Sequence, residues 1–372
     1  LYAQHRLAIT ALAPIGNTIV VVAAMVVFRV LAGPGDPGLD LSMSEQLTLA
    51  VGGTLGVAAF VAVPVIALYR AGFHLHPRWP RLDARLRRLL GLSGWAVFQH
   101  AEVGLLLGAA IIIGNGVAGG VVAYQVAFVF FLAPYAVLAQ PIHTAILPEL
   151  TREAGEPDRF AGSVRWALDA MAVLVVPVAA AACALALPAM RIVAFGEATR
   201  GDGVELLAAG VASLAVGLVG YGAFLLLARA SYALGDSRSP AFVALGTAAA
   251  GVAVMVIAGS QTGGAARVAA LGLGHSAAYL AGTVVMAAVL WRRLATPILP
   301  RLLPRVALVA AVVGTAAWVV ARAVDPAGRG GSLALLAVVL PVGAAVYAGG
   351  LALCRVPIPR RHAATGPAAD PT

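Results

Sequence analysis

Residues 170–188 have the sequence AMAVLVVPVAAAACALALP, a run of nineteen positions without a charged side chain. An α-helix needs about 20 apolar residues to cross the hydrocarbon core of a bilayer, so this run nearly suffices alone. Similar stretches at 19–27 and 105–113 reach spanning length with their flanks. The alternation of apolar and polar residues that is typical of membrane β-barrels is missing. The sequence therefore predicts an all-α integral membrane protein.

The composition of the whole chain supports this class. Of 372 residues, 61% are apolar and 11% are charged, and the mean hydropathy is +0.94. A water-soluble domain has about 25% charged residues. The two cysteines, Cys183 and Cys354, lie in or at the end of apolar runs and lack metal-ligand spacing, so we interpret them as packing residues.

The apolar runs predict about ten membrane spans. The loops and the tail between them are too short to hold a separate soluble enzyme domain. The approximate limits of the spans are 8–30, 47–69, 94–115, 119–147, 163–188, 204–229, 239–259, 266–290, 306–322 and 332–354.

The basic residues predict the orientation in the membrane. All 25 are arginine, and with these spans 19 of them fall on the side that holds both ends of the sequence, against six on the other. Cytoplasmic loops carry the excess of Lys and Arg, so we expect both ends in the cytoplasm. The net charge of +9 is then a consequence of topology, and we expect no nucleic-acid partner.

An internal repeat suggests a transporter of two similar lobes. Leu1, Tyr2 and Ala3, which lead into the first span, match Ser231, Tyr232 and Ala233, which lead into the seventh. Six spans separate the two copies, and an even number means that the copies run parallel. Parallel repeats related by an axis along the membrane normal are common in transporters.

Four segments resemble the MurJ/MviN lipid II flippase family of the multidrug/oligosaccharidyl-lipid/polysaccharide exporter superfamily. Residues 131–137 (FLAPYAV) and 144–154 (TAILPELTREA) are similar to its eighth helix and the loop that follows. Residues 230–240 (ASYALGDSRSP) are similar to its FYAL-x-D-T-x-T-P signature before helix eleven, and residues 1–17 to its fifth helix. The matches are correctly ordered and cover most of residues 1–293.

The resemblance implies a two-lobed, MATE-like bundle of fourteen helices, of which the ten spans are helices five to fourteen. We therefore expect an N-terminally truncated chain that lacks the first four helices. The expected parts are 1–77, the last two helices of the N-lobe; 78–297, a six-helix C-lobe with an interfacial amphipathic helix at 81–92; 298–356, two extra C-terminal helices; and 357–372, a disordered tail.

Glu102 is the most unusual residue of the predicted spans. A carboxylate well inside the third span costs roughly 2.5 to 3.5 kcal/mol on insertion scales and normally faces a cavity or a partner. We interpret it either as a proton- or cation-coupling group with Gln99 one turn away, or as a protonated residue packed in the bundle. In the family, a sodium site is formed by an acid of this helix and polar residues of helices eleven and twelve. The matching spans of this chain offer few polar residues, among them His275. This favours a proton over sodium as the coupling ion.

Other polar residues are weaker candidates. Tyr124 and Gln125 could meet the sugar or pyrophosphate of a lipid, although packing is the more common role. Asp169 could pair with Arg165 one turn earlier, which is more often structural than functional. The family also carries cavity arginines on helices one, two and eight, and the matching position on helix eight is Val129.

The resemblance implies a flippase and not an enzyme, with lipid II carried from the cytoplasmic to the outer leaflet of a bacterial plasma membrane by alternating access. Expected partners are an undecaprenyl-linked lipid, membrane lipids and cell-wall synthesis proteins. No metal or cofactor is expected, and transport would be coupled to a proton, a sodium ion or the membrane potential. Two alternatives stay open: an exporter of other polysaccharide-linked lipids or drugs, and a non-transporting scaffold for cell-wall synthesis.

Overall fold

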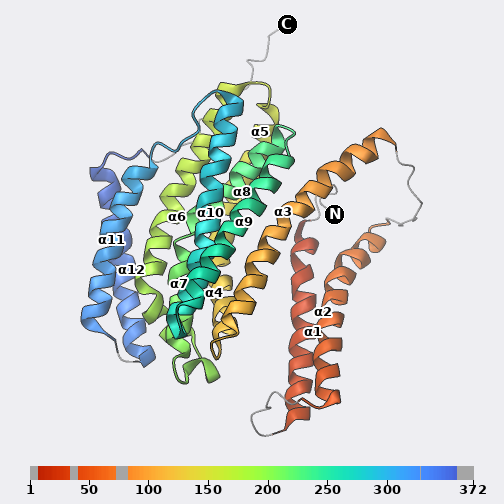
Figure 1. Cartoon of the computed structure of the whole chain (residues 1–372), viewed down its shortest axis with the longest axis vertical. Helices are drawn as coiled ribbons and strands as arrows, with labels where there is room; N and C mark the ends of the chain where they lie inside the picture. Colours follow the sequence, from red (N-terminus) through yellow and green to blue (C-terminus); the bar gives the residue numbers. More distant parts are fainter. Residues whose placement is uncertain (1–6, 34–40, 73–82, 327, 358–372) are drawn as a thin grey trace. The chain divides into compact units, whose positions relative to one another are not determined.

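The computed structural model describes residues 7–33, 41–72, 83–326 and 328–357, and every regular element in these ranges is a helix (Figure 1). The chain divides into two compact units, Leu1–Leu82 and Asp83–Thr372. Residues 358–372 of the tail predicted to be disordered lie outside the described residues.

The first unit is a pair of packed helices, α1 (Leu7–Ala32) and α2 (Met43–Arg70). Ser42 and Glu45 form a capping box at the start of α2, in which each side chain bonds the other's backbone N–H. Close approach of the two helices requires glycine. A Cβ at Gly52 would overlap that of Ala24, and one at Gly56 would meet Asn17.

The second unit holds the other helices, joined by short connections. A π-helical turn and a short 3-10 helix interrupt the α-helices. In chain order the elements are α3 (Ala84–Gly114), α4 (Gly120–Pro134), η2 (Tyr135–Ala139), α5 (Gln140–Arg152), α6 (Pro157–Val193), η3 (Gly196–Thr199), α7 (Gly203–Ala215), α8 (Leu218–Ala233), α9 (Arg238–Ser260), α10 (Gly264–Leu294), α11 (Leu303–Val324) and α12 (Gly328–Leu353).

The predicted spans are confirmed. In the described ranges nine helices, counting α4 to α5 as one, are long and apolar enough to cross a membrane, and α7 with α8 forms a tenth span bent by 44°. The segment predicted as an interfacial helix at 81–92 is helical from Ala84 onward and continuous with the span of α3, with Asp83 as its N-cap. Residues 81 and 82 lie outside the described ranges.

The break between α7 and α8 is held by side chains of α10. The Ser276 hydroxyl donates to the carbonyl of Ser213 at 2.7 Å, and the Thr283 hydroxyl to that of Gly220, also at 2.7 Å. Gly217 lies at the bend, where a Cβ would be 2.6 Å from the Cα of Ser276. The N–H of Gly217 bonds to the carbonyl of Leu214, so the Ser213 carbonyl loses its intrahelical partner at the break and the Ser276 hydroxyl replaces it. The Thr283 bond to Gly220, inside α8, ties α8 to α10 next to the bend.

The core of the second unit gathers large side chains from α4, α6, α8 and α10, including Tyr124, Phe160, Phe224 and Tyr279, each fully buried. Helices α11 and α12 lie against α6 at one edge of this unit (Figure 1). Leu185 of α6, Ala321 of α11 and Leu335 of α12 form a small apolar cluster there.

Candidate functional site

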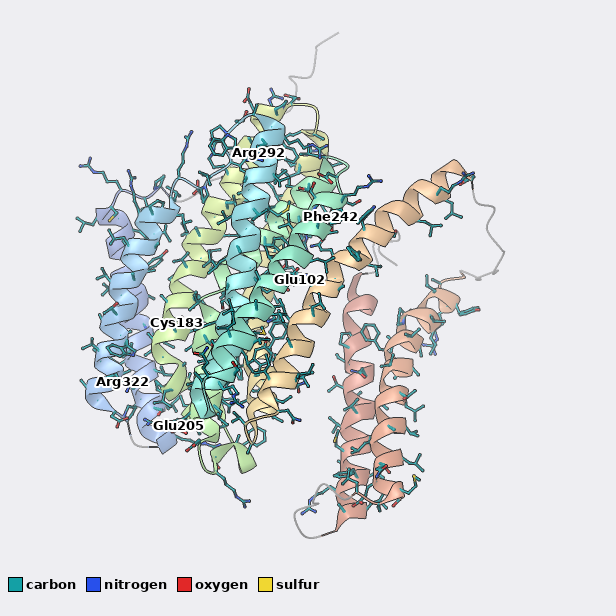
Figure 2. All side chains as sticks on the ribbon, viewed as in Figure 1. Glu102, Cys183, Glu205, Phe242, Arg292 and Arg322 are labelled. Carbon is teal, nitrogen blue, oxygen red and sulfur yellow. The ribbon has the colours of Figure 1, made fainter. Side chains whose placement is uncertain are left out.

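Glu102 lies part-way along α3, which packs against α9 and α10 (Figure 2). Its side chain is 3% exposed, and its Oε1 atom has no hydrogen-bond partner within the part of the chain that the structure describes. Burying a carboxylate in this way is unfavourable without a partner or a proton. A buried oxygen without a partner marks a position where a proton, an ion or a water molecule would be stabilised.

Gln99 is buried one turn before Glu102, as predicted, but its side-chain oxygen is already occupied. The hydroxyl of Tyr232, on α8, donates a hydrogen bond to this oxygen. Gln99 therefore ties α3 to α8 through its oxygen, and its amide NH₂ is the donor that it can offer to the acid.

Two tyrosines lie close enough to Glu102 to interact with it electrostatically: Tyr221 of α8 and Tyr279 of α10. Their rings are edge-to-face, with centroids 4.7 Å apart. The Tyr279 hydroxyl is buried and makes no hydrogen bond to any described residue. Sequence reasoning missed both tyrosines, because tyrosine is ordinary in an apolar span and nothing local indicates the face it turns inward.

His275 and Tyr124, both predicted candidates, are brought together by the fold. The Tyr124 hydroxyl and His275 Nδ1 form a buried hydrogen bond of 2.6 Å between α4 and α10. Nε2 of His275 has no described partner. The His275 and Tyr279 ring centroids are 5.0 Å apart, one helical turn along α10. Five residues therefore run side by side from α3 to α4, and we call them the interior polar cluster: Glu102, Tyr124, Tyr221, His275 and Tyr279.

A second histidine, His143 of α5, extends this line of polar groups along the span formed by α4, η2 and α5. Tyr135 packs edge-to-face on Tyr221 at 4.7 Å, and its hydroxyl lies 3.3 Å from Nδ1 of His143. The other ring nitrogen of His143 lies 3.2 Å from the sulfur of Met171, and Arg229 interacts electrostatically with both Tyr135 and His143. The interior of the unit thus holds several polar groups in an apolar surrounding.

The remaining two candidates lie elsewhere. Gln125 is exposed on α4, while its neighbour Tyr124 is buried, so the two residues lie on different faces of the helix. Asp169 of α6 accepts a 2.8 Å hydrogen bond from the backbone N–H of Leu302 and so holds the segment that leads into α11. No ion pair is formed between Asp169 and Arg165, although Arg165 acts on it electrostatically.

Asp236, the aspartate of the signature loop at 230–240, binds backbone N–H groups at the start of α9. Asp236 accepts hydrogen bonds from the backbone N–H groups of Arg238 and Ser239 at 3.1 and 3.0 Å and pairs with Arg293 at 3.3 Å. Partial burial acts to raise the pKa of Asp236, but the hydrogen bonds of Ser239 and Arg238 and the charge of Arg293 outweigh it and hold this pKa below its usual value. The loop is therefore a fixed connection between α8, α9 and α10.

No group of three or more His, Cys, Asp or Glu side chains lies together as a metal site among the residues described here. The interior polar cluster offers hydroxyl, imidazole and carboxyl groups instead. These groups can accept and donate protons, or hold a small cation against one carboxylate.

Comparison with known proteins identifies the family. The family model described as lipid II flippase MurJ matches residues 1–339. The chain belongs to the MurJ family. A MurJ described as a probable lipid II flippase, from Rhizobium tropici, is 26% identical over 240 residues, which are 63% of this chain and 43% of that protein. The match therefore spans less than half of this relative's length.

A solved MurJ structure confirms the fold class. The structure of lipid II flippase MurJ in an inward closed conformation matches with a TM-score of 0.66 at 16% identity, over 93% of this chain and 67% of that one. At this identity the likeness concerns the fold alone. Both the resemblance found in the sequence and the all-α membrane architecture of the MurJ chain are thus confirmed.

Proposed function

We propose that this MurJ chain acts in moving lipid II from the cytoplasmic to the outer leaflet of a bacterial plasma membrane, by alternating access and without covalent chemistry. The match of residues 1–339 to the MurJ family model carries this proposal. Undecaprenyl-linked lipid is the proposed substrate, cell-wall synthesis proteins are proposed partners, and both termini of the sequence are proposed to face the cytoplasm.

We infer that the interior polar cluster couples transport to a cation. Glu102 supplies the only carboxylate of the cluster, Tyr221 and Tyr279 lie within electrostatic range of it, and the His275 ring lies against Tyr279. Sodium prefers several hard oxygen ligands, including carboxylates and carbonyls, whereas a proton needs one acceptor and neighbours that stabilise the exchange. This set of groups favours a proton, with the membrane potential as a further driving force.

Replacement of the cell's own flippase tests the proposal. The complete gene is expressed in bacteria depleted of their MurJ, and the arrival of lipid II in the outer leaflet is measured by cleavage with an outer-leaflet-specific enzyme. We expect translocation and growth to be restored. Good membrane expression without translocation would contradict the proposal.

One observation favours a second candidate, a non-transporting scaffold of the same fold. Val129 stands where the family resemblance places a cavity arginine, and its side chain is 65% exposed on α4. A scaffold would leave lipid II translocation unrestored in the depleted cells while still recovering cell-wall synthesis proteins in pull-downs from the membrane. An exporter of other polysaccharide-linked lipids would restore transport of those lipids but not of lipid II.

A further inference from the structure

Tyr135 and His143 form a buried polar pair that the proposed coupling does not use. The Tyr135 side chain, in the π turn η2, is 6% exposed, and His143, on α5, is fully buried. The Tyr135 hydroxyl lies 3.3 Å from Nδ1 of His143. An imidazole can take up a proton at one nitrogen and release one from the other, and a hydroxyl both donates and accepts. The pair therefore has the groups that a proton relay requires.

The π turn brings the two side chains onto one line. The backbone N–H of Gln140 bonds to the carbonyl of Tyr135, five residues earlier, so the turn takes in one extra residue. Tyr135 and His143 are eight positions apart. In a regular α-helix, with about 100° per residue, they would lie about 80° apart around the helix axis, and the extra residue reduces this angle to about 20°. The irregular turn thus gives both side chains the same inward direction.

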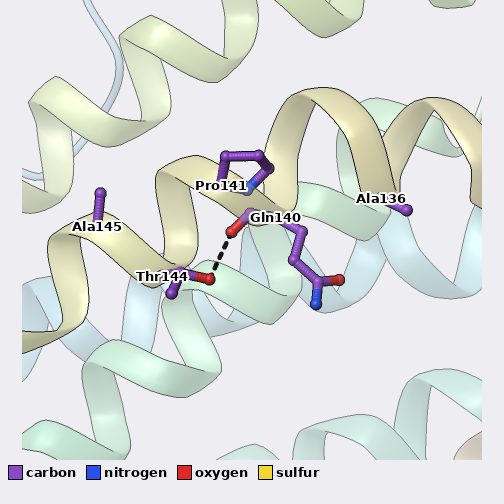
Figure 3. A pocket seen from close by; sticks show the side chains of 5 residues that line it. All are labelled: Ala136, Gln140, Pro141, Thr144 and Ala145. Carbon is purple, nitrogen blue, oxygen red and sulfur yellow. Dashed lines mark hydrogen bonds between the residues drawn. The ribbon is translucent and has the colours of Figure 1, made fainter. Parts of the chain in front are cut away.

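The exposed face of the same span is less suited to passing protons. Gln140 and Thr144 lie on it, and the Thr144 hydroxyl donates to the backbone carbonyl of Gln140 at 2.9 Å (Figure 3). A glutamine amide does not titrate near neutral pH, and the Thr144 proton is held by its own helix. The inward pair is therefore the better relay of this span.

The pair continues, ring against ring, to Glu102. Tyr135 packs edge-to-face on Tyr221 of α8 with centroids 4.7 Å apart, and Tyr221 packs in the same way on Tyr279 of α10. Both Tyr221 and Tyr279 interact electrostatically with Glu102. The Tyr279 hydroxyl and Oε1 of Glu102 make no hydrogen bond to any described residue, so both are available for proton exchange. An unbroken series of side chains thus leads from His143 to the acid.

Arg229 of α8 lies at the His143 end of this series. Its side chain is half-buried, whereas His143 is fully buried. Arg229 interacts electrostatically with His143, and also with Tyr135 and Tyr221. Its positive charge disfavours a second positive charge on His143 and stabilises a transient negative charge on either tyrosine oxygen. These charges favour a proton that passes through a neutral imidazole over one that stays on it.

The other described neighbours of His143 are uncharged. One ring nitrogen lies 3.2 Å from the sulfur of Met171 on α6, and a hydrogen bond joins the ring to the backbone of Gly222 on α8. The charge that acts on His143 is that of Arg229, and the titratable group beside it is Tyr135.

We propose that protons reach Glu102 through a relay line formed by His143, Tyr135, Tyr221 and Tyr279. His143 takes up a proton at one ring nitrogen and releases one from the other. Each tyrosine hydroxyl gives its proton to the next group and regains one from the group before, and the Glu102 carboxylate becomes a carboxylic acid. A water molecule can bridge two hydroxyls that do not meet directly. This inference rests on the coupling role proposed for Glu102 and adds to it the route by which the acid is loaded.

Infrared spectroscopy of the complete protein in nanodiscs tests the route, because a carboxylic acid and a carboxylate absorb at different frequencies. The band of Glu102 is identified by its loss in Glu102→Gln. Titration gives the midpoint of protonation, and a sudden drop in pH gives its rate. No lipid II is needed, so the result does not depend on transport.

Three variants interrupt the relay line at different helices: His143→Gln, Tyr135→Phe and Tyr221→Phe. The two tyrosine variants lose only a hydroxyl, so they keep the test valid if His143→Gln folds poorly. Tyr347→Phe is the matched control, since it removes a hydroxyl of α12 that bonds to the carbonyl of Val173. Size-exclusion profiles check that each variant is folded.

We expect all three variants to slow the protonation of Glu102 by about tenfold or more, as for the loss of a proton-transfer group, and Tyr347→Phe to leave the rate unchanged. In His143→Gln and Tyr135→Phe the titration midpoint should stay the same, because neither residue contacts Glu102. Protonation at the wild-type rate in these two variants would overturn the relay line, even if Tyr221→Phe is slow, while the coupling role of Glu102 stands. A Glu102 band that does not change with pH would overturn the proton coupling and the relay line together.

Discussion

Glu102 combines two properties that rarely occur together: it lies deep in a membrane span, and one of its oxygens has no hydrogen-bond partner among the described residues. A purely structural acid would be expected to use both oxygens in packing contacts. Tyr221 of α8 and Tyr279 of α10 lie within electrostatic range of it. A change in the protonation of Glu102, on α3, would therefore change the electrostatic interactions among three helices. The position of this carboxyl group makes it the first residue to test.

Replacing Glu102 by glutamine should abolish coupling and keep the fold. Glutamine has nearly the same shape but cannot exchange a proton or bind a cation through charge, so we expect lipid II translocation in proteoliposomes to fall by about tenfold or more. The melting temperature should stay equal or rise, because a neutral amide costs less to bury than a carboxylate.

Glu205→Gln is the matched control, since Glu205 is exposed at the start of α7. Unchanged translocation in Glu102→Gln, with the control also unchanged, would show that Glu102 has only a packing role.

The two buried tyrosines of α4 and α10 should differ in their effect on stability. Tyr124→Phe removes the partner of His275 and leaves a second ring nitrogen unpaired, so we expect a loss of about 1–3 kcal/mol in unfolding free energy. Tyr279→Phe removes a hydroxyl without a described partner and should change stability by less than about 0.5 kcal/mol. Denaturation in detergent measures both, and equal losses would contradict this difference.

Single residues were the least predictable level of the site. The sequence predicts Glu102, Gln99, Tyr124 and His275 as candidates because polar groups in apolar spans are conspicuous. The Tyr124–His275 contact joins residues 151 positions apart, and no local pattern indicates it. Tyr221 and Tyr279 were missed for the same reason, since their neighbours come from other helices.

At the level of elements, the spans followed from hydropathy because a bilayer fixes both their length and their apolar character. Two irregularities did not follow. The bend between α7 and α8 is held by the Ser276 hydroxyl of α10, 63 positions away in the chain. No local pattern in the sequence indicates the π turn at Tyr135–Ala139.

The bend between α7 and α8 should not tolerate a methyl group. In Gly217→Ala the new Cβ would meet the backbone of Ser276, which cannot move without shifting α10, so we expect a loss of about 1–3 kcal/mol in unfolding free energy. Gly246→Ala, on α9 with nothing within 4 Å of its added Cβ, is the matched control and should be neutral or stabilising by up to about 1 kcal/mol. Melting curves of the two variants measure this difference. Equal stability of the two variants would contradict the close contact at Gly217.

At the level of the whole molecule, the arginine distribution predicts which side of the protein faces the cytoplasm. The excess of arginine on one side predicts that the connection between α5 and α6 is cytoplasmic and the one between α9 and α10 is outside.

Cysteine labelling in intact cells checks this orientation. With Cys183 and Cys354 replaced by alanine, Gln261→Cys should react with a membrane-impermeant thiol reagent, and Gly155→Cys should react only after the membrane is opened. Both positions are exposed, so accessibility does not limit either reaction. The reverse pattern would contradict the proposed topology.

The first unit carries an implication for biosynthesis. The tight contacts of Gly52 and Gly56 are made with Ala24, Asn17 and Val21, all within the same pair of helices. Such a pair can complete its packing once α2 has entered the membrane, while most of the second unit is still untranslated. Substituting these glycines would therefore be felt during membrane insertion, as slower release or degradation of the nascent chain, earlier than any defect in transport.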